Sequence, residues 1–112
     1  MMAANRRRGE VAATIDGRER RLCLTLGALA ELEEAFALDD ISALAARFGS
    51  GRLAARDLVR VIGAGLRGAG EAVSDEEVAA MRFERGAAGA AALATALLEA
   101  AFGVEEAAPA HP

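Results

Sequence analysis

Hydrophobic positions follow two different spacings along this chain. Residues 10–24 alternate apolar and polar side chains around Asp16-Gly17, a strong sequence signal for a two-residue type I′ turn. The pattern predicts a β-hairpin over 10–24 whose apolar face must pack on helices or on another chain. Counting outward from the turn predicts three facing pairs: Val11 with Leu22, Ala13 with Arg20, and Ile15 with Arg18.

After residue 25 the apolar residues recur every three or four positions, which is the spacing of helices. Thr25 is a suitable N-cap for the first helix, and Gly49-Ser50-Gly51 interrupts the chain after the second. Ser74 with Glu77 has the pattern of a capping box. The predicted helices span about 26–37, 40–48, 53–67, 75–84 and 88–102.

Composition supports a mainly helical protein. Alanine is abundant, aromatic residues make up 4% of the chain, and Trp and Tyr are absent; this balance favours helix over strand. The expected fold class is α+β, mostly α: an N-terminal hairpin followed by about five short helices in one domain over 9–103. Residues 1–8 are expected to form a flexible basic arm and 104–112 a disordered tail. Either Met1 or Met2 can be the natural start.

Charge and apolar content limit the partners to be expected. The net charge is −4 at pH 7, so nothing indicates nucleic-acid binding. The Ala-rich segment 87–102 is shorter than the ~20 residues that span a bilayer, and no apolar signal stretch follows Arg6–Arg8. Cys23 is the only cysteine, which fits a reducing compartment. We expect a cytoplasmic protein without membrane or nucleic-acid partners.

Groups suited to catalysis are scarce. His111 is the only histidine and is the last residue but one, and Cys23 has no plausible base. No metal-ligand spacing occurs. Acidic clusters at 31–34, 39–40 and 75–77 are typical of exposed helix faces and helix N-termini. We therefore expect no enzyme activity, no metal and no cofactor.

Residues 63–68, Gly-Ala-Gly-Leu-Arg-Gly, match the G-x-G-x-x-G fingerprint of dinucleotide-binding turns, and Glu84 follows at about the required distance. That fingerprint needs a buried strand before it, and such a strand would bury Arg60. The preceding apolar residues have helical spacing instead. Dinucleotide binding through Gly63–Gly68 is thus a remote alternative to a helix in which Gly63 and Gly65 admit a close neighbour or add flexibility.

Four stretches of the chain carry a further signal. They are NRRRGE (5–10), LCLTLGALAELEEAF (22–36), GRLAARDLVRVIGAGLRGAG (51–70) and SDEEVAAM (74–81). In this order and spacing they resemble a family of small proteins from the tail-gene block of alphaproteobacterial gene transfer agents and related prophages. The resemblance covers about residues 2–103. The family is commonly labelled phage tail tube protein, and its genes lie between those of the major tail protein and the tape measure.

The resemblance implies a non-enzymatic protein of tail morphogenesis and leaves two roles open. A structural tail tube subunit resembles a β-sandwich whose sheets join into rings, which needs many strands. A small, acidic, mostly helical protein better suits a tail assembly chaperone, which coats a helical tape measure until the tube forms. We expect the chaperone role, with the tape measure and other tail proteins as partners; as a tube subunit the protein would be part of the particle.

Candidate contact residues come from the basic arm, the hairpin and the helix that holds the glycine motif. Self-association is expected, and the hairpin and the Gly63–Gly68 segment are the surfaces that the pattern favours for it. The candidate partner-contact residues are Arg6, Arg7, Arg8, Arg20, Arg60, Gly63, Gly65 and Arg67.

Overall fold

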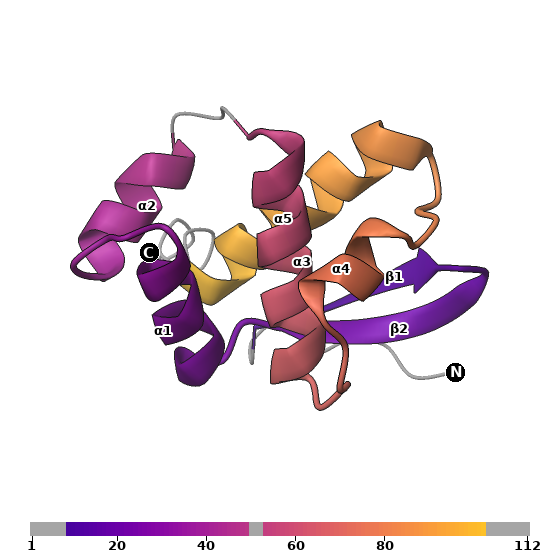
Figure 1. Ribbon diagram of the computed structural model, residues 1–112, viewed down its shortest axis with the longest axis horizontal. Helices are drawn as coiled ribbons and strands as arrows, with labels where there is room; N and C mark the ends of the chain where they lie inside the picture. Colours follow the sequence, from indigo (N-terminus) through magenta and orange to yellow (C-terminus); the bar gives the residue numbers. More distant parts are fainter. Residues whose placement is uncertain (1–8, 50–52, 103–112) are drawn as a thin grey trace, which may run out of the picture.

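The chain begins with an antiparallel hairpin and continues as helices (Figure 1). The computed structural model describes residues 9–49 and 53–102, so the expected arm (1–8) and tail (104–112) lie outside the described residues. The elements are β1 (Glu10–Ile15), β2 (Arg18–Cys23), α1 (Leu26–Ala35), α2 (Ile41–Gly49), α3 (Ala55–Gly68), α4 (Asp75–Ala79) and α5 (Gly86–Phe102). The predicted fold class, a hairpin followed by helices in one small domain, is confirmed.

The hairpin has the register that the sequence predicts, with Val11 opposite Leu22 and Ile15 opposite Arg18. Asp16 and Gly17 have φ angles of 56° and 77°. A type I′ turn requires left-handed angles at both positions, which glycine adopts without cost and aspartate tolerates. The face that carries Val11, Ile15 and Leu22 is buried, so the hairpin packs on the helices as expected.

Side chains at two helix starts supply the predicted caps. Thr25 Oγ1 accepts a hydrogen bond from the Ala28 amide at 3.1 Å. Ser74 Oγ accepts from the Glu77 amide at 3.1 Å, and the Ser74 amide donates to Glu77 Oε1 at 2.8 Å. The capping box at α4 is therefore complete, and it fixes where the chain enters this short helix.

Helix α3 lies at the centre of the fold, where it packs against β2, α1, α4 and α5 (Figure 1). All residues from Val61 to Leu66 are buried, so this part of the helix is enclosed on every side. Helix α5 covers α3 and β1 with an almost entirely uncharged sequence. The largest fully buried side chains are Ile15, Leu22, Leu32, Leu44, Val61, Ile62, Leu66, Val78 and Leu97.

Helix α4 ends at Ala79, whereas the sequence predicts helix to residue 84. The segment after it pairs with the hairpin: Phe83 forms an antiparallel bridge with Ile15, and the Asp16 amide donates to the Arg82 carbonyl at 2.8 Å. The Arg82 amide in turn donates to Asp16 Oδ1 at 2.9 Å. These contacts with a segment far away in the sequence outweigh the local helical preference of residues 80–84.

Asp16 joins the hairpin turn to this segment through its backbone and its side chain. Asp16→Ala removes the acceptor of the Arg82 amide and places alanine at a left-handed φ, so we expect a loss of about 1–3 kcal/mol in stability. Asp16→Asn keeps an acceptor oxygen and tolerates the same φ, so it should stay within about 0.5 kcal/mol of the parent. Urea unfolding measures both, and equal losses would contradict this role.

Candidate partner-binding surfaces

The glycines of α3 admit other parts of the same chain. A methyl group at Gly63 would collide with the carboxylate of Asp75, and one at Gly68 would collide with the carbonyl oxygen of Cys23. At Gly65 a methyl group would lie 3.0 Å from Leu97 Cδ1 and 3.3 Å from Leu22 Cβ, also from within the chain. Of the two interpretations of these glycines, the structure supports close packing.

The phosphate-binding interpretation of Gly63–Gly68 is wrong. These residues continue one helix, whereas a dinucleotide fingerprint marks a turn between a strand and a helix. Gly63 and Gly65 are buried within the fold, so the structure does not place them on a partner-binding surface. In residues 9–49 and 53–102, no group of three or more His, Cys, Asp or Glu side chains is placed to hold a metal ion. No helix in the same part of the chain is long and apolar enough to cross a membrane.

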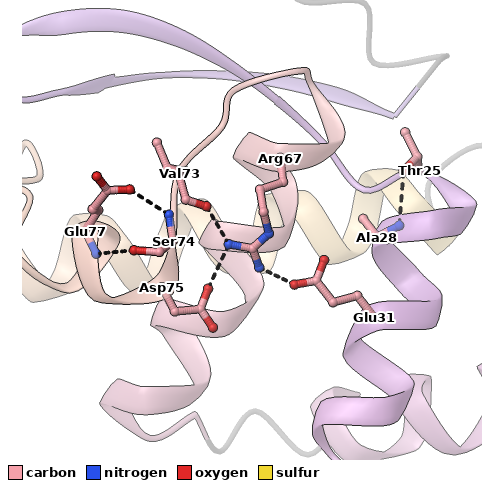
Figure 2. A network of polar contacts seen from close by, with 8 residues as sticks. All are labelled: Thr25, Ala28, Glu31, Arg67, Val73, Ser74, Asp75 and Glu77. Carbon is pink, nitrogen blue, oxygen red and sulfur yellow. Dashed lines mark hydrogen bonds and ion pairs between the residues drawn. The ribbon is translucent and has the colours of Figure 1, made fainter.

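Arg67 connects α3 to α1 and to the start of α4 (Figure 2). Its Nη1 donates to the Val73 carbonyl at 2.9 Å and lies 3.1 Å from Asp75 Oδ1. Its Nη2 forms a hydrogen-bonded ion pair with Glu31 of α1. Gly63 lies one helical turn before Arg67, and its missing side chain leaves the space in which the Asp75 carboxylate reaches the guanidinium.

This environment raises the pKa of Arg67 above its ordinary value. Burial of the guanidinium acts to lower the pKa, but the contacts with Glu31 and Asp75 and their negative charges raise it by more. Arg67 therefore stays charged and is already balanced by two carboxylates of its own chain. An acidic partner would have to displace one of them.

The other predicted contact arginines have partners within the chain as well. Arg20, on the inner face of the hairpin, has a side chain only 11% exposed and donates to Glu71 Oε1 at 2.9 Å. Arg60 donates to the Ala35 carbonyl at 3.2 Å and lies 5.5 Å from the centre of the Phe36 ring. Arg20, Arg60 and Arg67 thus each contact a different part of the same chain, and Arg6–Arg8 lie outside the described residues.

A polar cluster that sequence reasoning missed joins α1, α2 and α3. Asp57 is 2% exposed, and its Oδ2 accepts from the Ala54 amide at 2.9 Å and from Arg47 Nη2 at 3.2 Å. The Arg47 guanidinium lies 5.3 Å from the centre of the Phe36 ring and 5.6 Å from that of Phe48. One sequence signal points to the role of Asp57. It is an acid in the first turn of α3, and the N-cap residue, Ala54, has no polar side chain to cap the helix.

Two apolar grooves lie between helices. The larger, about 360 Å³, opens between α2 and α5 and is formed by Phe48, Leu53, Leu98 and Phe102, with Thr95 and Glu99 beside them. The smaller, about 230 Å³, lies between α3, α4 and the start of α5. Sequence reasoning did not identify the α2–α5 groove, because its walls come from elements about fifty residues apart.

Comparison with known protein families gives a match over most of the chain. Residues 8–104 match the model of a family described as phage tail tube protein, GTA-gp10. This range includes the hairpin and all the helices of the described residues. No curated protein and no solved structure matches the chain significantly.

The close contact at Gly68 can be tested against a glycine in an equivalent place. Gly68 and Gly49 each end a helix, but a methyl group at Gly49 would meet nothing within 4 Å. Gly68→Ala should therefore destabilise the protein by about 1–3 kcal/mol, because backbone must move, whereas Gly49→Ala should be neutral or slightly stabilising. Thermal unfolding measures both variants, and equal behaviour would contradict the packing role of Gly68.

The link through Arg67 can be tested in the same helix. Arg67→Met removes the donor to Val73 and both ion pairs, so we expect a loss of about 1–3 kcal/mol in stability. Arg56→Met, at an exposed position in the first turn of α3, should change stability by less than about 0.5 kcal/mol. Chemical unfolding gives both values. A loss at Arg67 no larger than at Arg56 would show that the network contributes nothing.

Proposed function

The chain belongs to the family described as phage tail tube protein, GTA-gp10, and from this premise we propose that it is a tail assembly chaperone-type factor that binds the tape measure protein. In this role it acts in the cytoplasm while a gene transfer agent or prophage-like particle is assembled. It works without catalysis, by contact with other tail proteins. A structural tail tube subunit is the second candidate, which the description of the family favours.

The small amount of β-sheet is the observation that carries the proposal. In the described part of the chain, the sheet consists of the hairpin, extended by one bridge between Ile15 and Phe83. A tube in which sheets of neighbouring subunits join into a ring requires more strands from each subunit. Helices with apolar surfaces between them suit contact with another protein's helices.

The α2–α5 groove offers a place for a helix of the tape measure. Phe48, Leu98 and Phe102 provide apolar surface, while Glu99 on the rim can pair with a basic residue of the bound helix. Each such contact is modest in strength, but many copies along a long tape measure together give stable binding. Self-association and a contact of Arg6–Arg8 with an acidic partner belong to the same proposal.

Co-expression with the tape measure protein tests the function. The parent chain should keep the tape measure soluble and purify with it. Thr95→Arg places a long charged side chain in the groove from an exposed position, so the recovered complex should fall at least tenfold. Ala88→Arg, exposed on the same helix two turns earlier, is the control and should retain the complex.

Two results would count against this proposal. If the tape measure stays insoluble beside the parent chain and no complex is recovered, the chaperone function fails. If the complex forms equally with the parent, Thr95→Arg and Ala88→Arg chains, the function holds but the groove is not the binding site.

A further inference from the structure

The two edges of the hairpin carry very different side chains. Strand β2 reads Arg-Glu-Arg-Arg over residues 18–21, and such charges on an edge strand oppose pairing with other chains. Strand β1 reads Val-Ala-Ala-Thr over residues 11–14 and has no charge between Glu10 and Ile15. The edge of β1 therefore lacks the charged side chains that protect the edge of β2.

A groove of about 340 Å³ runs along this edge of β1. Residues 11–14 form one wall, Gly89, Ala92 and Ala96 of α5 form the other, and Phe83 lies at one end. The volume is at the lower end of the roughly 300–1,000 Å³ that is usual for ligand pockets. Glu84 and Arg85 also line the groove beside Phe83, and Leu93 lines it from α5. Because Ala12, Gly89, Ala92 and Ala96 are small, a bound backbone can come close to both β1 and α5.

A short piece of the chain already occupies the turn end of this edge. Phe83 pairs with Ile15 as an antiparallel strand would, and the Asp16 amide donates to the Arg82 carbonyl. The chain then turns away into α5 through Arg85 and Gly86, whose φ angles are 67° and 62°. Residues 82–83 thus pair with the turn end of β1 as the start of a third strand would, and the chain leaves this edge after them.

The register shows which backbone groups of β1 face the groove. In a hairpin with a two-residue turn, the pair that flanks the turn, here Ile15 and Arg18, exchanges hydrogen bonds, and every second pair does the same. Ala12 falls at a position between two such pairs, so its N–H and C=O point away from β2. Ala12 is exposed and lines the groove, which places an amide donor and a carbonyl acceptor there.

We propose that this groove, the β1 slot, binds one extended segment of a partner polypeptide, rich in small side chains, as an added strand antiparallel to β1. The added strand continues the line of residues 82–84. Small side chains such as Ala, Ser, Gly or Val face α5. Recognition rests on backbone hydrogen bonds, so the slot tolerates many sequences. This inference follows from the geometry of the hairpin, residues 82–86 and α5, and does not depend on the proposed function.

Selection from a displayed library of random short peptides tests the slot, with the enriched peptides synthesised and their affinity measured by fluorescence anisotropy. Ala12→Pro removes the amide that faces the slot and leaves the β1–β2 hydrogen bonds intact, because proline is tolerated at such edge positions. We expect at least tenfold weaker binding. Glu19→Pro makes the equivalent change on the opposite edge of the hairpin and should bind as the parent does.

A second pair of variants keeps the test valid if proline disturbs the hairpin. Ala92→Leu fills the slot from the exposed side of α5, and Ala88→Leu is its control on the same helix. The first should weaken peptide binding at least tenfold and the second should leave it unchanged. Amide hydrogen exchange should show new protection at Ala12 when peptide is bound.

The proposal is overturned if no peptide is enriched, if the enriched peptides bind both variants of the slot as well as the parent, or if protection arises elsewhere. The proposed occupant is wrong if peptides do not bind and the protein instead forms dimers that Ala12→Pro dissociates. In that case a second copy pairs along β1. Failure here leaves the co-expression result untouched, so the slot and the chaperone function are tested separately.

Discussion

Close approach of the chain to helix α3 is the constraint on which the rest of the structure depends. The start of α4 meets the helix at Gly63, the side chains of Leu22 and Leu97 meet it at Gly65, and the end of β2 meets it at Gly68. Each contact needs the space that a side chain would fill. Because α3 passes through the middle of the fold, these three positions fix where the hairpin, α4 and α5 lie relative to one another.

The same constraint determines which surfaces are available to partners. The middle of α3 is buried, and Arg67 is engaged with Glu31 and Asp75 in holding neighbouring elements. Grooves are left around the periphery, between α2 and α5 and along the edge of β1. The α2–α5 groove is lined mainly by Phe and Leu side chains. The groove beside β1 is lined by small residues of β1 and of the Ala-rich helix α5, with Phe83, Glu84 and Arg85 beside them. In the roles that we propose, the protein would bind others by shape and by backbone contact more than by charge.

Local signals in the sequence predict much of this fold. The Asp16-Gly17 turn determines the register of the hairpin, and Thr25 and Ser74 mark helix starts, because each effect acts over a few residues. Contacts between distant segments were not predictable in this way. The pairing of Phe83 with Ile15 shortened α4, and the ion pair between Arg47 and Asp57 depends on how α2 meets α3. The sequence left open whether Gly63 and Gly65 admit a close neighbour or add flexibility, and in the structure both glycines are closely approached by parts of the same chain.

The choice between chaperone and tube subunit is the central functional claim, and quantitative mass spectrometry of purified particles tests it most directly. Peptides of this chain are counted relative to those of the major tail protein, in particles and in the cells that assemble them. An assembly chaperone should be abundant in the cells and absent, or present only in traces, in purified particles. Copy numbers in the particle comparable to those of the major tail protein would contradict the account and establish a tube subunit.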